Sequence, residues 1–172
     1  MVAYVGALLV LGSFYFGDVA YLWKGLLIAA LYMLFDLLWT YARDRVWYVP
    51  SSSVISGFIL AVVGAPAPSI DLLILLPFVA VASKQLIKLG TQRHIFNPAS
   101  FSIIALSIFG YPAVSWWGVA WGIPVLYTVL LAGLFILWRQ NRWETAISFL
   151  VSYAVFLGAL FLWQGREVSQ LF

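Results

Sequence analysis

Apolar segments recur along the whole of this 172-residue chain, and their lengths constrain the fold more than any other feature. A helix that crosses a bilayer squarely needs about 20 predominantly apolar residues. Four of the segments reach that length, namely 20–41, 70–89, 118–138 and 144–164, whereas those at 51–65 and 97–112 fall short of it. The pattern predicts an all-α, polytopic membrane helical bundle of about five to seven segments, two of which are short or broken helices. The apolar segments are 2–16, 20–41, 51–65, 70–89, 97–112, 118–138 and 144–164.

The composition excludes several classes of protein. Hydrophobic residues make up 65% of the chain and charged residues only 9%, whereas a soluble domain carries about 25% charged residues. We therefore expect a single transmembrane domain over residues 1–172, in contact with the lipid bilayer. The chain has no cysteine and one histidine, so we predict no metal site. The net charge is +3, and the basic residues fall in loops between the apolar segments. This distribution favours a role of these residues in membrane orientation over nucleic-acid binding.

The basic residues are distributed unevenly between the two sets of loops. If every segment crosses the membrane, seven of the nine Lys and Arg residues lie on one side, and only Lys24 and Arg166 lie on the other. The positive-inside rule then predicts a multi-pass protein of the plasma (inner) membrane, with a cytoplasmic N-terminus and an external C-terminus. Trp116, Trp117 and Trp121 are expected near one interface, as part of an aromatic belt.

Both short segments open with residues that favour a helix start. Ser51-Ser52-Ser53 follows Pro50, and Asn97 precedes Pro98; Asn is a preferred N-cap and Pro is tolerated at the first helical position. Because unpaired N–H groups make a helix start attractive to anions, we expect the two starts to converge on one site. The alternative is that Asn97 only satisfies its own backbone.

A basic loop precedes the second short segment. Lys84, Lys88, Arg93 and His94 are candidates for a lip that binds an anionic ligand or a partner. The same residues also fit a simpler role, in which they set the membrane orientation and contact lipid phosphates. His94 can relay a proton, since the reference pKa of histidine is about 6.5.

Asp36 lies well inside an apolar segment and is the candidate for an ion or proton path. A lone carboxylate there costs about 3 kcal/mol on insertion scales unless it is paired, protonated or hydrated. Lys24 lies about 18 Å away along the helix, at 1.5 Å per residue, so it cannot be the partner. We expect a partner on another helix, such as Ser83 or Lys84, or on another subunit.

The Ser-rich helix start, the turn Ala65-Pro66-Ala67-Pro68 and the stretch KQ…G…HIFNPA occur in that order. On these motifs the chain resembles the family that contains the D subunit of the Rnf complex and the B subunit of the sodium-translocating NADH:quinone oxidoreductase. The resemblance covers about residues 51 to 115, and the chain looks like one half of a full-length member. It is strongest at Ser56-Gly57, Lys84-Gln85, Gly90 and the segment Phe96-Asn97-Pro98-Ala99.

The resemblance implies one half of a fold similar to that of urea transporters, and non-covalent binding of FMN or riboflavin. It implies no covalent FMN, because Thr40, Thr91, Thr128 and Thr145 lack the family's Ser-Gly-Ala-Thr context. The implied partners are other membrane subunits of a redox complex or a second copy of the chain. The candidate cofactor-binding residues are Ser53, Ser56, Gly57, Lys84, Gln85, His94, Asn97 and Pro98.

The leading hypothesis is a small membrane subunit of an Rnf-like electron-transfer complex, which supports ion-coupled or transmembrane electron transfer. It is a subunit of a membrane oxidoreductase rather than an autonomous enzyme. The alternative is a small-solute transporter or channel formed by a homodimer of half-repeats. A third hypothesis is a scaffold for assembly or lipid binding that has no ligand of its own.

Overall fold

The computed structural model describes residues 1–47, 51–66, 68–89, 93–94, 96–141 and 143–163. Apart from the connecting loops, these residues form helices and one two-residue antiparallel pair of strands, in which Lys88 pairs with His94 and Leu89 pairs with Arg93. The elements are α1 Val2–Phe16, α2 Val19–Asp44, α3 Ser51–Val63, α4 Ile70–Leu86, β1 Lys88–Leu89, β2 Arg93–His94, α5 Pro98–Ile108, α6 Ile123–Gln140 and α7 Trp143–Trp163.

One helix forms in each predicted apolar segment, and the all-α prediction is confirmed. The largest differences in bounds are that α6 begins at Ile123 and not at 118, and that α5 ends at Ile108 and not at 112. Three of them, α2, α6 and α7, are long and apolar enough to cross a membrane, and the chain is a membrane protein. The two predicted short helices are α3, with 13 residues, and α5, with 11. At 1.5 Å per residue they span about 20 Å and 16 Å, less than the roughly 30 Å of a bilayer core.

Local sequence explains how the first two helices begin and end. Gly17 terminates α1 in the left-handed conformation, with a φ of 68°, which glycine adopts without steric cost. The carboxylate of Asp18 accepts a hydrogen bond from the backbone N–H of Ala20 at 2.8 Å and so caps the start of α2. This two-residue connection makes α1 and α2 an antiparallel hairpin.

Contacts divide the chain into two compact units. Met1–Val125 contains α1 to α5, and Leu126–Phe172 contains most of α6 and all of α7. In the second unit, no described side chain of α7 is buried within the protein. That these units form one transmembrane domain stays a prediction.

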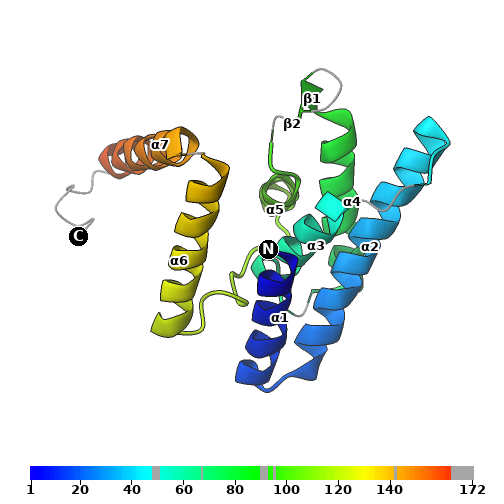
Figure 1. The fold of residues 1–172 in the computed structure, drawn as a ribbon, viewed down its shortest axis with the longest axis horizontal. Helices are drawn as coiled ribbons and strands as arrows, with labels where there is room; N and C mark the ends of the chain where they lie inside the picture. The colour runs from blue at the N-terminus through cyan, green and yellow to red at the C-terminus, as the bar shows by residue number, and fades with distance from the viewer. Residues whose placement is uncertain (48–50, 67, 90–92, 95, 142, 164–172) are drawn as a thin grey trace. The chain divides into compact units, whose positions relative to one another are not determined.

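The hydrophobic core of the first unit surrounds α3. This helix packs against α1, α2, α4 and α5, and Figure 1 shows it in the middle of the unit. The largest fully buried apolar side chains come from all four of the helices α1 to α4, and include Leu9, Ile28, Tyr32, Leu60 and Leu76.

Small residues bring α2 and α3 into close contact. A Cβ atom built on Gly57 would lie 2.9 Å from the backbone Cα of Ala29, and one built on Gly25 would lie 3.5 Å from the Cβ of Ala61. Such contacts let two helix backbones approach closely within a membrane. They also show that the helices run antiparallel.

Both ends of α3 lie short of the ends of α2. The start of α3 lies beside Asp36. At 1.5 Å per residue, Asp36 is about 12 Å before the last residue of α2. Near the other end of α3, Ala61 lies beside Gly25, which is about 9 Å after the first residue of α2. The backbone groups at both ends of α3 therefore need partners within the protein.

Candidate functional site

A buried carboxylate is the centre of the candidate site. Asp36 on α2 has no solvent-exposed surface, and both of its oxygens accept hydrogen bonds. Oδ2 accepts from the Ser53 hydroxyl at 2.6 Å and from the Lys84 ammonium at 2.8 Å. Oδ1 accepts from the side-chain amide of Gln85 at 2.7 Å.

Lys84 completes a buried ion pair. Its side chain is only 8% exposed, and it lies in the last turn of α4. Besides Asp36, its ammonium donates to the Ser53 hydroxyl at 2.6 Å and to the Ser52 hydroxyl at 3.3 Å. Three donors of the ammonium thus have three oxygen partners, as a buried lysine requires.

The site joins three helices at one level. α2 supplies the carboxylate, the first turn of α3 supplies the hydroxyls, and the last turn of α4 supplies the ammonium and the amide. The positive end of a helix stabilises a nearby carboxylate, so the start of α3 adds to the attraction exerted by Lys84. Since both charges are paired and hydrogen-bonded, the cluster can persist in a low-dielectric environment, although removing either partner leaves an uncompensated charge.

A second layer links this cluster to the surface. The side-chain oxygen of Gln85 accepts a hydrogen bond from Nη1 of Arg43 at 2.8 Å. Arg43 also forms a two-bond ion pair with its neighbour Asp44, in which the Arg43 side chain is 46% exposed. Gln85 therefore connects an exposed ion pair to a buried one.

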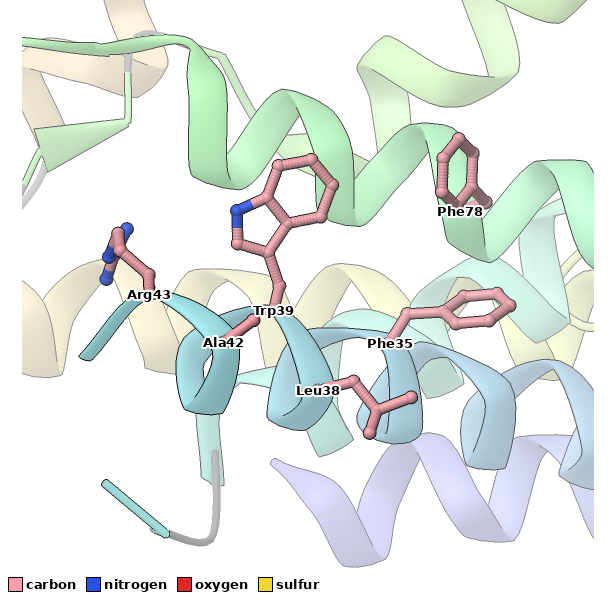
Figure 2. A pocket seen from close by; sticks show the side chains of 6 residues that line it. All are labelled: Phe35, Leu38, Trp39, Ala42, Arg43 and Phe78. Carbon is pink, nitrogen blue, oxygen red and sulfur yellow. The ribbon is translucent and has the colours of Figure 1, made fainter. Parts of the chain in front are cut away.

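An apolar groove lies next to Arg43. It has a volume of about 520 Å³ and is lined by Phe35, Leu38, Trp39, Ala42, Arg43 and Phe78. Figure 2 shows Trp39 and Phe35 pointing from α2 toward α4, where the ring of Phe78 meets that of Phe35 edge to face at 5.9 Å. The lining is mainly aromatic and aliphatic, as expected for a surface in contact with lipid tails.

The other end of α3 is held by the backbone. The carbonyls of Ala61, Val62 and Val63 lie in the last turn of α3, so no N–H group of a following helical turn donates to them. The segment 115–118 supplies the donors. Val63 O accepts from the N–H groups of residues 115 and 116 at 3.0 Å each, Val62 O accepts from the N–H of Gly118 at 2.9 Å, and Ala61 O accepts from Nε1 of Trp117 at 2.9 Å.

The structure confirms the predicted pairing of Asp36. Of the two partners proposed from the sequence, Lys84 forms the ion pair, whereas the Ser83 hydroxyl donates to the carbonyl of Ala80. The structure thus brings together four of the candidate residues, Asp36, Ser53, Lys84 and Gln85.

Two other candidates lie on α3 outside this cluster. Gly57 is a packing residue, because Ala29 fills the place that a larger side chain would need. Ser56 is near the hydroxyl of Tyr32 but forms no hydrogen bond with it. Neither of them contacts Asp36 through a hydrogen bond among the described residues.

The predicted helix start at Asn97 is also confirmed. Its side-chain oxygen accepts from the N–H groups of Ala99 and Ser100 at 3.0 and 3.5 Å, and Pro98 occupies the first helical position. Asn97 therefore satisfies its own helix. The backbone of His94 belongs to β2, but its side chain lies outside the described part of the structure, as do those of Lys88 and Arg93.

Trp117 differs from the predicted aromatic belt. It is 5% exposed and packs edge to face on Tyr21, with ring centroids 5.2 Å apart. Trp116 is 55% exposed, as a belt residue would be. The sequence does not distinguish these adjacent tryptophans, because the difference arises from the contact of Trp117 with a distant helix end.

Two residues of the network around Asp36 lie outside the site candidates predicted from the sequence. Ser52 belongs to the predicted helix start, and Arg43 to the basic residues that predict the membrane orientation, yet both join the network. The position of Arg43, seven residues after Asp36 and therefore on the same helical face, was an available signal.

Comparison of the chain with protein-family models, with curated proteins and with solved structures finds no match.

Proposed function

We propose that the chain is a small membrane subunit of an electron-transfer complex of the Rnf type, in which Asp36 lies on the path of an ion or proton. The buried Asp36–Lys84 pair carries this proposal. Ionisable residues inside a membrane are costly, and those that persist commonly serve ion pathways or proton relays. Two of the stretches on which the family resemblance rests, the Ser-rich helix start and Lys84-Gln85, both contact Asp36.

The arrangement gives the carboxylate two states that differ in charge. When Asp36 is ionised, it holds Lys84, Ser53 and Gln85 together, and α2, α3 and α4 are joined at this level. Protonation of the carboxylate, or its binding of a cation, removes the attraction for Lys84 and weakens the junction of the three helices. Uptake of an ion is in this way coupled to helix packing.

Non-covalent binding of FMN or riboflavin stays part of the proposal, but not at this cluster. The donors of Ser53, Lys84 and Gln85 already serve Asp36, so they do not fit a flavin at the same time. We therefore assign the ion path to the cluster and place any flavin elsewhere in the complex. An absorbance spectrum after gentle detergent extraction tests whether the chain itself carries a flavin.

The proposed topology has a cytoplasmic N-terminus and an external C-terminus in the inner membrane, with the chain similar to one half of a urea-transporter-like fold. Arg43 in the last turn of α2 and Arg45 directly after it support this orientation. Cysteine residues introduced at Lys24 and Arg45, and labelled from each side of intact cells, provide the test. Labelling of both positions from the same side would contradict the orientation.

The function is tested in membrane vesicles from cells that lack the gene for this chain. We expect loss of electron transfer coupled to ion movement, recovery with the native chain, and electron transfer with reduced ion movement in Asp36→Asn. Asp71→Asn is the matched control, since this carboxylate is exposed at the start of α4. Unchanged electron transfer and ion movement in the deletion strain would contradict the proposal.

One observation favours a second candidate, a small-solute transporter or channel built from two copies of the chain. Both ends of α3 lie within the length of α2, and short helices that end at membrane depth line substrate sites in many transporters. Solute flux into liposomes containing the purified chain, in the absence of flavin absorbance, would favour this candidate over the redox subunit.

A further inference from the structure

Exposure decreases in steps from the surface to Asp36. The side chain of Arg43 is 46% exposed, that of Gln85 is half-buried, and that of Asp36 is fully buried. The steps are connected, because Arg43 donates to the oxygen of Gln85 and the nitrogen of Gln85 donates to Asp36, at 2.8 and 2.7 Å. One amide therefore spans the distance between the surface and the buried carboxylate.

The opposite direction is closed by the core. One turn before Asp36 on α2 lies Tyr32, and one turn before Lys84 on α4 lies Ala80; both are fully buried. Val81 and Ile28 continue this dry layer, with exposed fractions of 0% and 1%. A water molecule or an ion that moved from Asp36 in this direction would meet the buried hydroxyl of Tyr32. Beyond it lie the close-packed apolar side chains of Ile28 and Val81.

We propose that Gln85, held by Arg43, is the gate through which Asp36 exchanges protons or ions with the aqueous phase at the C-terminal ends of α2 and α4. In the closed state, Gln85 occupies the Oδ1 atom of Asp36 and is itself held by the guanidinium. Opening requires rotation of a single half-buried side chain and the loss of its hydrogen bonds to Asp36 and Arg43, without separation of the helices. Asp36 is then reached from one side only.

This gate goes beyond the proposed function, because it concerns access to Asp36 and applies equally to a redox subunit, a transporter or a scaffold. Its test does not require electron transfer. Gln85 is a positioning residue here, since it acts on the exchange of Asp36 and not on a substrate.

The test is chemical labelling of carboxylates. The purified full-length chain in detergent is treated with a water-soluble carbodiimide and an amine, which convert accessible carboxyl groups to amides, and the extent of reaction at each residue is measured by peptide mass spectrometry. The exposed Asp71 is the internal reference. In the native chain, we expect Asp36 to react much more slowly than Asp71.

Substitution of the gate should raise the rate at Asp36 and leave Asp71 unchanged. We expect an increase of about tenfold for Gln85→Ala, since a hydrogen bond to a charged group no longer opposes opening. Arg43→Met should give a smaller increase, because Gln85 loses its anchor but still contacts Asp36. Leu86→Ala is the control: it is adjacent in sequence, 70% exposed, and should match the native rate.

Thermal unfolding of each variant separates opening from loss of structure. An unchanged rate at Asp36 in a Gln85→Ala variant with a native midpoint would overturn the proposal, as would equally fast reaction of Asp36 and Asp71 in the native chain. If Gln85→Ala does not fold, Arg43→Met decides the question, because its side chain is partly exposed. A faster reaction at Asp36 with a native midpoint supports the gate, and a native rate overturns it.

Discussion

The two ends of α3 solve the same problem in different ways. At its start, the hydroxyls of Ser52 and Ser53 join a network of charged side chains from α2 and α4. At its end, the carbonyls of Ala61 to Val63 are satisfied by backbone N–H groups and one indole from the segment 115–118. A helix that stops within a membrane needs partners at both ends, but only one of these ends carries exchangeable charge.

The difference assigns different roles to the two ends. A network of side chains can change its protonation, release a partner and rotate, so the start of α3 suits a reaction or a switch. The backbone N–H groups and the indole at the other end carry no charge and do not change protonation, so this end is suited to hold α3 in place. We therefore expect substitutions at the start to affect activity and those at the end to affect stability alone.

The largest expected effect comes from removing the carboxylate. Asp36→Leu leaves the ammonium of Lys84 buried without its counter-ion and should lower the free energy of unfolding by about 3–5 kcal/mol. It should also impair activity or assembly. The measurement is unfolding in detergent, together with recovery of the protein from membranes.

Asp44→Leu is the control for this substitution. Its ion pair with Arg43 is exposed, with side chains 43% and 46% accessible, and exposed pairs contribute about 0–1 kcal/mol. Equal and negligible effects of the two substitutions would show that the buried pair has no special role.

A smaller effect is expected at the opposite end of α3. A Cβ atom on Gly118 would lie 2.5 Å from the Cβ of Val62 and 3.0 Å from its Cα, so Gly118→Ala should displace the segment that caps the helix. We expect a loss of about 1–3 kcal/mol in unfolding free energy and no faster labelling of Asp36. Faster labelling would mean that the two ends are coupled. Gly133→Ala is a suitable control, because nothing lies within 4 Å of its added Cβ.

The indole hydrogen bond should contribute less. Trp117→Phe keeps an aromatic ring against Tyr21 but leaves the carbonyl of Ala61 without its donor, so we expect a loss of about 1 kcal/mol. Chemical unfolding detects this loss. Trp116→Phe should change little, because Trp116 is largely exposed; a larger effect there would contradict the assignment of the structural role to Trp117.

The smallest net effect on stability is expected when both charges are removed together. In Asp36→Leu/Lys84→Met no unpaired charge remains, and such replacements in other proteins are often neutral within about 1 kcal/mol or stabilising. The double variant should therefore unfold like the native chain but lack ion-coupled activity. If it is as unstable as Asp36→Leu, the hydroxyls and Gln85 depend on the charges for their packing.

The sequence was sufficient for features that depend on neighbouring residues. Hydropathy located the helices, and the start of α5 at Asn97-Pro98 followed from the capping preferences of those two residues. The cost of a carboxylate in an apolar helix predicted that Asp36 needs a partner. Ser83, Lys84 and a residue of another subunit were the candidates, and only the packing of α4 on α2 distinguishes them.

Features that depend on distant contacts could not be predicted. The indole of Trp117 donates to a carbonyl 56 positions earlier in the chain, and no local pattern marks one tryptophan of an adjacent pair for burial. The bond from Arg43 to Gln85 likewise joins residues that are 42 positions apart. The segment predicted at 70–89 is helical only as far as Leu86. Lys88 and Leu89 form β1 instead, which pairs with β2.

The cap on the end of α3 has a consequence for biosynthesis. The carbonyls of Ala61, Val62 and Val63 receive their donors from residues 115–118, which leave the ribosome only after α4 and α5 have been made. Until then, immersion of this helix end in hydrocarbon would leave three polar groups without partners, at a cost of several kcal/mol each. We therefore expect α3 to reach its final position in the bilayer only together with the segment 115–118 that supplies these donors.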